Sequence, residues 1–379
     1  MQPEVVEINI YAYPDFCSGL TNIAKHWFQI FIFIKSRAAV TGGGNSNAKP
    51  AQSPIPACKP RHLKYYYMRI LLLLNFLSIP FLLFAQYNGE PKELSIDSAA
   101  FATLKLPGSP DFLAPDGDDV WILNIDRVEK LSAKRKKPVL SVPIPGACGA
   151  MIVGFNSLWV ASCSKQAIYR IDNRTGKLLS VVPCGISDKN GEIMLAIGNN
   201  SLWVLSDSTG VLTRISAKTN KIQALIAVLP NSHCAVFDFN SVWITNTTAN
   251  SVQRINPKIN KVVATINVGK TPRFLAAGEN GVWTLNQGDG TVSHIDPEQN
   301  KVIAIVDTKV PGVGGDIATG AGHVWVRAKK GIFLQAINCL SNIVDSIYTP
   351  VYGSGAVRIT QNYVWVTAHD INTIWILKR

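Results

Sequence analysis

Residues 241–283 read SVWITNTTANSVQRINPKINKVVATINVGKTPRFLAAGENGVW, and this stretch begins and ends on a Val-Trp pair. Between the two pairs lie short runs of β-branched and apolar residues, separated by turn-forming segments such as NPKIN and GENG. Runs of this length and composition predict β-strands joined by tight turns. One unit therefore predicts four strands, which in residues 273–306 are RFLAA, VWTLN, TVSHID and KVIAIV.

The aliphatic-Trp pair recurs along the chain at a nearly constant interval. Successive Trp residues of these pairs lie 38, 44, 40, 40, 42 and 40 positions apart. A period of about 40–45 residues built from short strands is the signature of β-propeller blades. We expect each Trp to be buried in the second strand of its blade rather than to form an aromatic ladder for a ligand. The residues are Trp121, Trp159, Trp203, Trp243, Trp283, Trp325 and Trp365.

The two ends of the repeat region predict how the ring closes. After Trp365 the chain runs VTAHDINTIWILKR to Arg379, which leaves the last unit with three strands. Residues 99–106, AAFATLKL, match a fourth strand that has no blade of its own. Pairing the two removes the exposed edges of an open ring. The predicted fold class is therefore an all-β, seven-bladed β-propeller whose last blade takes one strand from the N-terminus and three from the C-terminus.

Residues that tolerate positive φ recur at two turns of the unit. One lies three residues before each Trp, at Asp118, Asn156, Asn200, Asn240, Asn280, Gly322 and Asn362. The other lies between the third and fourth strands, at Gly176, Asn220, Asn260 and Asn300. Lys136 takes this second place in the first unit, so we expect strain or a longer turn there.

Residues 68–85 have the layout of a secretory signal peptide. Basic residues precede the apolar run ILLLLNFLSIPFLLFA, which closes on the small residue Ala85. The run is short for a membrane-spanning helix, which needs ~20 residues, and Pro80 interrupts it. We therefore expect a bacterial periplasmic or secreted protein whose signal begins at Met68, with an uncleaved membrane anchor as the alternative.

The predicted domain organisation follows from that signal. A signal peptide belongs at an N-terminus, so residues 1–67 are interpreted as a spurious or disordered extension. Residues 86–379 then form the propeller. The formal charge of the chain is +12, but its basic residues are scattered, with one dense run at 133–137. A nucleic-acid-binding protein gathers its charge into a patch, so we expect no nucleic-acid partner, and we expect a monomer.

The repeat resembles the YVTN-type propeller repeat of bacterial and archaeal surface proteins and the units of the virginiamycin B lyase superfamily. Residues 156–182, NSLWVASCSKQAIYRIDNRTGKLLSVV, carry the aliphatic-Trp pair and the Arg-Ile-Asp turn of those units. The resemblance spans residues 97–379. For the lyase it implies metal-assisted opening of a cyclic ester, with a His base and Glu metal ligands in the central cavity.

One departure from the lyase pattern concerns the metal. The lyase units commonly carry Glu three residues after the Trp, and a hard divalent cation prefers charged oxygen ligands. No carboxylate occupies any of these positions here. They hold Asn124, Ser162, Ser206, Asn246, Asn286, Ala328 and Ala368.

The candidate ligand site lies on one face of the predicted ring. Loops that enter the innermost strands and loops that join the second and third strands meet around one end of the channel, which we term the channel mouth. Polar groups that converge on a concave mouth predict a ligand site. The residues expected there are Asp111, Glu192, His233, Arg273, Asp316, Arg327 and His369.

These residue types favour a small polar or anionic ligand. Arg273 and Arg327 would hold it, and His233 and Glu192 are the candidates for proton transfer. The alternative is that all of them are ordinary loop residues that line a wet channel. His294 and His323 belong to the opposite face, and we expect both at the surface.

Four cysteines are expected on the channel-mouth face: Cys148, Cys163, Cys184 and Cys234. An exported protein can form disulfides, and we expect one between Cys148 and Cys184. The alternative is a zinc or copper site built from Cys148, Cys163, Cys184 and His233. Cys339 is expected on the opposite face as a free thiol.

Taken together, the sequence favours a non-enzymatic binding module without a cofactor, which holds a small ligand, a glycan or a protein at the channel mouth. The first alternative is a lyase-like enzyme with a divalent metal, and the second is a metal or redox site at the cysteine-bearing face. A catalytic site would bring a His and at least two carboxylates within hydrogen-bond reach of one another at the mouth. Phosphate-binding loops, nucleophile elbows and HExxH motifs are absent from the sequence.

Overall fold

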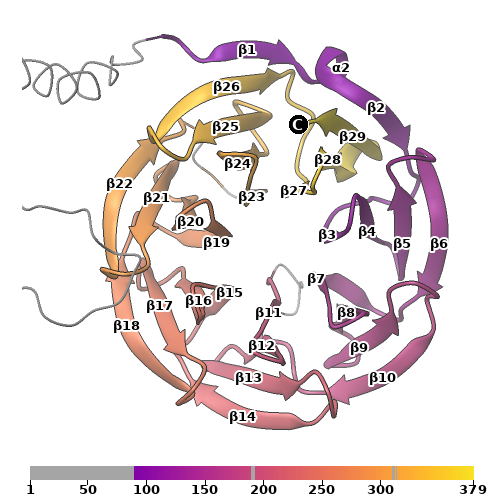
Figure 1. Ribbon diagram of the computed structural model, residues 1–379, viewed down its shortest axis with the longest axis vertical. Coiled ribbons are helices and arrows are strands. Elements are labelled where there is room, and N and C mark those ends of the chain that lie inside the picture. The colour runs from indigo at the N-terminus through magenta and orange to yellow at the C-terminus, as the bar shows by residue number, and fades with distance from the viewer. Residues whose placement is uncertain (1–88, 189–192, 310–311, 313) are drawn as a thin grey trace, which may run out of the picture. The chain divides into compact units, whose positions relative to one another are not determined.

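The computed structural model describes residues 89–188, 193–309, 312 and 314–379. The expected signal segment 68–85, residues 1–67 and Glu192 lie outside the described residues. The described chain forms seven small sheets arranged in a ring around a central channel (Figure 1). The molecule is a seven-bladed β-propeller, and the predicted fold class is confirmed.

The blades are numbered here in chain order, and their strands run outward from the channel. Blade 1 holds β3 (Leu113–Asp116), β4 (Asp119–Asn124), β5 (Arg127–Ser132) and β6 (Lys137–Pro143); blade 2 holds β7 (Ala147–Gly154), β8 (Ser157–Ser162), β9 (Ala167–Asp172) and β10 (Leu178–Pro183); blade 3 holds β11 (Ala196–Gly198), β12 (Ser201–Asp207), β13 (Val211–Ser216) and β14 (Ile222–Ala227). Blade 4 holds β15 (Ser232–Asp238), β16 (Ser241–Asn246), β17 (Ser251–Asn256) and β18 (Lys261–Asn267); blade 5 holds β19 (Pro272–Gly278), β20 (Gly281–Asn286), β21 (Thr291–Asp296) and β22 (Lys301–Asp307). Blade 6 holds β23 (Gly315–Gly320), β24 (His323–Ala328), β25 (Leu334–Asn338) and β26 (Ile343–Thr349); blade 7 holds β27 (Val357–Ile359), β28 (Tyr363–Ala368) and β29 (Thr373–Lys378).

The N-terminal strand β2 (Ala100–Lys105) completes blade 7. It pairs antiparallel with β29, and Thr103 lies opposite Trp375. This is the closure that the sequence predicts. The ring therefore joins its first and last segments by main-chain hydrogen bonds rather than by side-chain packing alone.

A second N-terminal strand was not expected. The strand β1 (Lys92–Ser95) pairs parallel with β26 and adds a fifth strand to the outer edge of blade 6 (Figure 1). A single helical turn, α2 (Ile96–Ala99), links β1 to β2, and Ser95 caps it. The segment before the first blade thus pairs with two blades. Its short strand β1 lacks the length and alternation from which sequence could predict it.

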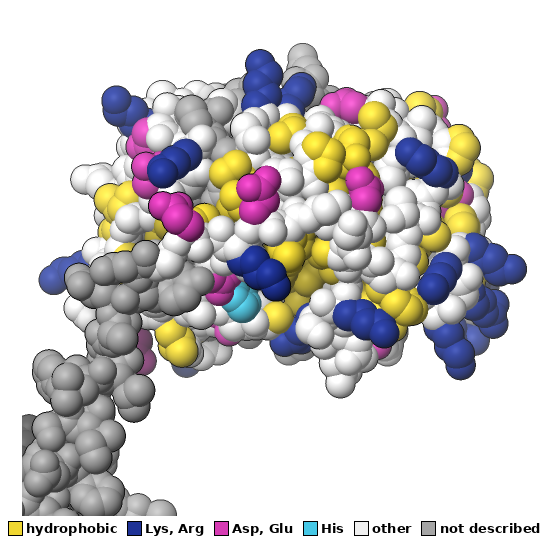
Figure 2. Space-filling model, turned by 90° about the horizontal axis from the view of Figure 1, so that it is seen from above, with side chains coloured by type: hydrophobic (Ala, Val, Ile, Leu, Met, Phe, Trp, Pro, Cys, Tyr) yellow, Lys and Arg dark blue, Asp and Glu magenta, His cyan; other side chains and the backbone are white. Residues whose placement is uncertain are grey.

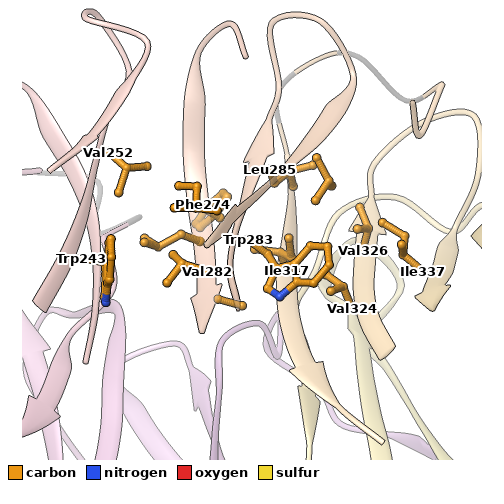
Figure 3. Close-up of a cluster of buried hydrophobic side chains, with 14 of the residues drawn as sticks. Trp243, Val252, Phe274, Val282, Trp283, Leu285, Ile317, Val324, Val326 and Ile337 are labelled. Atoms are coloured by element: carbon orange, nitrogen blue, oxygen red, sulfur yellow. The ribbon is translucent and has the colours of Figure 1, made fainter. Parts of the chain in front are cut away.

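Trp side chains fill the spaces between blades, as predicted. Six of the seven repeat Trp residues are fully buried, and Trp325 is 7% exposed. Figure 3 shows Trp243 and Trp283 among aliphatic side chains of blades 4 to 6. The indole N–H of Trp243 donates to the carbonyl of Asp238 at 3.2 Å, a bond that satisfies the one polar atom of the buried ring.

The hairpins between first and second strands use two left-handed residues in five blades, blades 2 to 6. In blade 3 these are Asn199 (φ 50°) and Asn200 (φ 56°). Paired positive φ values are typical of type I′ turns, whose twist matches that of the flanking strands. Asp118 and Asn362 are not left-handed, so the turn prediction is wrong for blades 1 and 7; in blade 1 the positive φ falls on Gly117.

The Lys136 turn in blade 1 has ordinary length. Its N–H donates to the carbonyl of Ser132 at 2.8 Å, as the Asn220 N–H does to Ser216 at 2.9 Å in blade 3. Lys136 nevertheless adopts φ 55°, so the expected strain is present and the longer turn is not. Its ammonium lies 4.1 Å from the centroid of the Phe101 ring, a contact that offsets part of that strain.

An Arg in the third strand joins its own Trp to the next blade. Arg214 stacks on Trp203, with the guanidinium carbon 4.7 Å from the ring centroid. Its Nε donates to Ser201 at 2.8 Å, and one terminal nitrogen donates to the carbonyl of Pro257 and to Asn260 of blade 4, at 2.7 and 2.9 Å. We call this arrangement the blade clamp; Arg170 in blade 2 and Arg254 in blade 4 repeat it.

His294 replaces the clamp Arg in blade 5, and the expectation that it lies at the surface is wrong. The ring is 5% exposed and stacks on Trp283, with 3.6 Å between centroids. Its Nδ1 lies 2.8 Å from Asn342 of blade 6. His323 is half-buried and bridges the carbonyl of Ala321 and Asp345, both at 2.8 Å. Both histidines therefore serve packing between strands and blades.

The outer wall of the ring carries apolar side chains between charged ones (Figure 2). The outermost strands β14 and β22 expose Leu225 and Ile305. Within the described residues, no helix has the length and apolar character to cross a membrane.

Candidate functional site at the channel mouth

The innermost strands of blades 6 and 7 place a buried ion pair in the channel. The Asp316 carboxylate in β23 pairs with Arg358 in β27, and it also accepts main-chain N–H groups from Ile317 at 2.9 Å and Val357 at 3.1 Å. Burial raises the pKa of Asp316, while the Arg358 charge and these hydrogen bonds oppose that rise. Because the carboxylate has three donors around it, it acts as a fixed structural acceptor.

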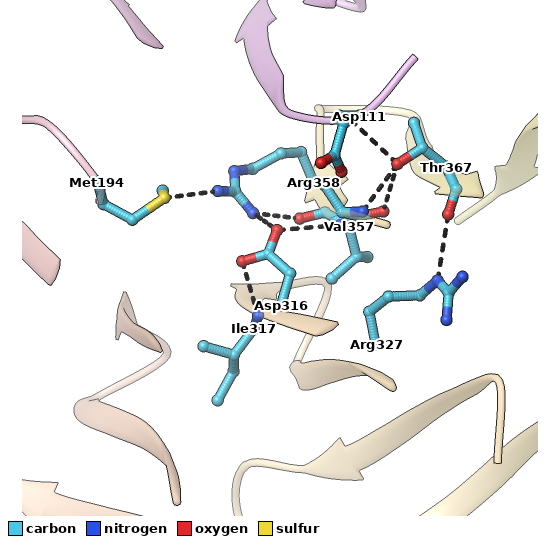
Figure 4. A network of polar contacts seen from close by, with 9 residues as sticks. Asp111, Met194, Asp316, Ile317, Arg327, Val357, Arg358 and Thr367 are labelled. Carbon is cyan, nitrogen blue, oxygen red and sulfur yellow. Dashed lines mark hydrogen bonds and ion pairs between the residues drawn. The ribbon is translucent and has the colours of Figure 1, made fainter. Parts of the chain in front are cut away.

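Arg358 also reaches across the channel. Its second terminal nitrogen lies 3.3 Å from the sulfur of Met194, which precedes the innermost strand of blade 3 (Figure 4). The side chain of one blade thus contacts the opposite side of the ring. At this level the channel is bridged.

A second charged cluster lies where blade 7 meets blade 1. His369 begins a short 3-10 turn, η1 (His369–Ile371), that follows β28. Its Nδ1 lies 3.3 Å from the Asp111 carboxylate and its Nε2 lies 2.7 Å from Asp370. The hydrogen bond with Asp111 raises the pKa of His369, and the charges of both carboxylates add to this effect.

Asp370 fixes the neighbouring loop as well. Its second carboxylate oxygen accepts the Ser354 N–H at 3.0 Å, and the His369 N–H donates to the carbonyl of Ser354 at 3.1 Å. Asp111 is anchored through its own carbonyl, which accepts a hydrogen bond from Thr367 at 3.0 Å. We refer to Asp111, His369 and Asp370 as the mouth cluster. Asp370 was missed by sequence reasoning, although it directly follows His369.

Arg327 does not face the channel mouth. Its guanidinium is fully buried between blades 6 and 7 and donates to the carbonyls of Ala328, Phe333, Gly353 and Thr367. Burial lowers the pKa of Arg327 to about 9. Its hydrogen bonds end on main-chain acceptors of two blades, so it joins blades rather than presenting a charge to a ligand.

His233 and Arg273 lie on the inner side of blades 4 and 5. The His233 ring is 8% exposed, and its Nδ1 lies 3.2 Å from the Cys234 sulfur. Its Nε2 lies 3.5 Å from Asp188. Arg273 is half-buried in β19, and its charge acts on Cys234, whose pKa burial nevertheless raises well above the ordinary value. His233 therefore lies in a packed environment rather than in an open mouth.

The expected disulfide between Cys148 and Cys184 is wrong. Cys148 is bonded to Cys163, which ties the strand entering blade 2 to the loop after its second strand. Cys184 and Cys339 are free thiols, and burial raises the pKa of each to about 12. Over the described ranges, no group of three His, Cys, Asp or Glu side chains has the arrangement of a metal site.

Three of the seven side chains that lie three residues after a repeat Trp hydrogen-bond to the loop that enters their own blade. Asn124 donates to the carbonyl of Pro107 at 2.9 Å, Ser162 to Pro145 at 2.6 Å and Asn246 to Pro230 at 2.7 Å. Each acceptor lies in the loop that enters the same blade. These buried side chains therefore hold the entry loops in place, and they do not line an open cavity.

Comparison with known proteins supports the fold and leaves the activity open. No family model matches the chain, and no curated protein matches it. Among solved structures, a streptogramin B lyase superimposes with a TM-score of 0.61 at 14% identity, covering 73% of this chain and 96% of the lyase. The virginiamycin B lyase of Staphylococcus aureus gives the same score and identity, covering 73% of this chain and 98% of its own.

BamB from Moraxella catarrhalis superimposes with a TM-score of 0.56 at 8% identity, and the match covers 74% of this chain and 99% of BamB. U3-55K gives a TM-score of 0.62 at 11% identity, covering 76% and 100% respectively. At these identities the similarity concerns the propeller architecture, which hosts unrelated functions.

Proposed function

We propose that this protein is an exported binding module that holds a protein partner on the channel mouth, through the mouth cluster and the adjoining charged residues of blades 5 and 6. One observation carries the proposal. The partly exposed charges of the mouth cluster join blades 7 and 1, while Arg358, in a buried ion pair with Asp316 of blade 6, bridges the channel. The channel is bridged, and partly exposed charges lie at its rim. The mouth is therefore better suited to contact the surface of a protein than to enclose a small molecule.

The electrostatics favour a partner with complementary charges of both signs. Asp370 is the most exposed member of the mouth cluster, with 45% of its side chain accessible. Exposed Lys329 and Lys330 follow the second strand of blade 6 on the same face. Complementary charges across an interface increase the specificity and the rate of association more than they increase the affinity.

The test is affinity capture from the exported fraction of the source cells. Wild type and a Lys221→Glu control, altered on the opposite face, should retain the same partner. The double variant Arg273→Ala/Asp370→Ala should lose most of it. A partner retained equally by all three proteins would overturn the proposal, as would the absence of any partner specific to wild type.

One specific observation favours the hypothesis of a lyase-like enzyme, because His369 lies within hydrogen-bond reach of two carboxylates. A general base needs a ring nitrogen that is free to accept a proton. Both nitrogens of His369 face carboxylates, and its raised pKa favours the protonated ring. A virginiamycin B lyase structure similar to this chain contains quinupristin, so quinupristin with Mg²⁺ is the substrate to test. We expect no ring-opened product on chromatography, and a product that disappears with His369→Ala would establish the enzyme instead.

A further inference from the structure

Two grooves open on the face opposite the channel mouth, each between neighbouring blades. The groove between blades 2 and 3 has a volume of about 650 Å³, and the groove between blades 4 and 5 about 520 Å³. Both grooves are lined by equivalent elements. One blade contributes the Phe in the turn between its first and second strands. The next blade contributes its two turns on this face and its outermost strand. The residues that line the two grooves can therefore be compared position by position within one molecule.

Phe155, at the edge of the blade 2–3 groove, adopts a conformation that bulky residues avoid. Its φ is 54°, and its side chain is 40% exposed. The equivalent position in blade 3 holds Asn199, which adopts φ 50° at lower cost. Ser157 and Arg170 both donate to the Phe155 carbonyl, at 3.1 and 3.4 Å, and so hold the turn in this form. Phe239 at the edge of the blade 4–5 groove has the same conformation, with φ 47°. The strain therefore belongs to both grooves, and the other residues that line them distinguish the two.

The rest of the blade 2–3 groove is polar and cationic. Asn199, Asn200 and Gln223 present exposed amides, and the Gln223 oxygen is held by the Ser201 hydroxyl at 3.2 Å. Lys218 is exposed at the groove, and Arg214 contributes a second positive charge. Among the described residues, those that line this groove include no carboxylate.

The blade 4–5 groove has the opposite character at matching positions. Glu298 stands where Lys218 stands, Asp296 replaces Ser216 and Ile303 replaces Gln223. The repeat therefore supplies the shape of both grooves, and individual residues set their chemistry.

We propose that the blade 2–3 groove binds a saccharide unit that carries a carboxylate or sulfate group. The Phe155 ring offers a flat apolar surface for the C–H face of a pyranose. The amides of Asn199, Asn200 and Gln223 supply donors and acceptors for hydroxyl groups. Lys218 and Arg214 attract the acidic group. This groove is separate from the channel mouth, so the proposal can be tested independently of the function proposed above.

Calorimetric titration of the purified protein tests the proposal with three hexasaccharides and a DNA control. The probes are a galacturonate oligomer, a sulfated heparin fragment, neutral maltohexaose and a single-stranded oligonucleotide. We expect at least one of the acidic sugars to bind at least about tenfold more tightly than maltohexaose. Binding of the galacturonate oligomer shows that a carboxylate suffices, whereas binding of the heparin fragment alone, which carries both groups, shows that sulfate is required. The absence of binding by both acidic sugars would overturn the proposal.

Variants distinguish specific binding in the blade 2–3 groove from non-specific attraction to a positively charged face. Phe155→Asn should weaken binding about tenfold, and Lys218→Glu, which copies the blade 4–5 groove, should weaken it at least as much. Glu298→Gln in the other groove should leave affinity unchanged. DNA binding as tight as sugar binding, with no effect of Phe155→Asn on either, would refute the site.

The strain at Phe155 gives a second readout. Because Asn tolerates positive φ, Phe155→Asn should leave the melting temperature unchanged or raise it by about 1–3 °C while it weakens binding about tenfold. A clear fall in melting temperature would instead show that Phe155 is there for packing, and would contradict the proposal.

Discussion

His369 is held between two carboxylates at the junction of the first and last blades. The imidazole contacts Asp111 of blade 1 and Asp370 of its own blade, and all three side chains are partly exposed. Its pKa is raised, chiefly by the hydrogen bond with Asp111. A group whose folded pKa is raised stabilises the fold fully below its unfolded pKa, about 6.5 for His, and loses that contribution as pH rises through the folded value.

We therefore predict that wild type exceeds His369→Asn in stability most at about pH 6 and that the difference declines above neutrality. Because the three groups are partly exposed, the difference at its largest should be about 0.5–1 kcal/mol. Urea denaturation of both proteins from pH 6 to pH 9 measures it. A difference that grows with pH would show that the ring is not held as an imidazolium.

Blades 2, 3 and 4 are each joined to the next blade by a blade clamp. Arg254 stacks on Trp243, with 4.9 Å between the guanidinium carbon and the ring centroid. It donates to Ser241 at 2.8 Å within its blade, and to the carbonyl of Pro297 at 2.6 Å and Asn300 at 2.9 Å in the next. A planar guanidinium can stack and donate in several directions at once, which an ammonium cannot.

Arg254→Ala should lower the free energy of unfolding by about 2 kcal/mol, since it removes the stacking and several charge-assisted hydrogen bonds. Arg254→Lys should recover little of this loss. Lys261→Ala, an exposed change on the same face, should stay within about 0.5 kcal/mol of wild type. Chemical denaturation of the three variants provides the measurement, and full recovery by Lys would mean that charge alone matters.

At the scale of the whole molecule, one N-terminal segment holds blades 6 and 7. Strand β1 pairs with blade 6, and β2 completes blade 7. Between them Ile96 is fully buried, and Asp97 accepts hydrogen bonds from the Trp375 indole at 2.8 Å and the Tyr352 hydroxyl at 2.7 Å. Removing the two strands should therefore have different consequences.

A truncation that begins at Ala99 keeps β2 and removes β1, Ile96 and Asp97. We expect it to fold with a loss of at least about 2–3 kcal/mol, the contribution of Ile96 burial alone. A truncation that begins at Leu106 leaves blade 7 with three strands and an open edge. It should lose more than about 4 kcal/mol or fail to fold cooperatively. Urea titrations followed by circular dichroism distinguish the two, and equal stability of both truncations would contradict closure by β2.

The sequence alone determined the ring. The seven Trp residues at near-constant spacing set the number of blades, and residues 99–106 predicted the closing strand, because both signals are local patterns that each blade repeats. The same patterns placed the innermost strands, and with them Asp111, Asp316 and His369, near one end of the channel.

Only the tertiary structure decided which side chains meet, both within a blade and across blades. Cys148 bonds to Cys163 rather than Cys184, and Arg327 points into the space between two blades although its strand ends near the mouth. Arg358 reaches Met194, which is far away in sequence. Such contacts depend on loop paths and on the rotation of one blade against the next, and no repeat pattern encodes them, because the residues involved differ from blade to blade.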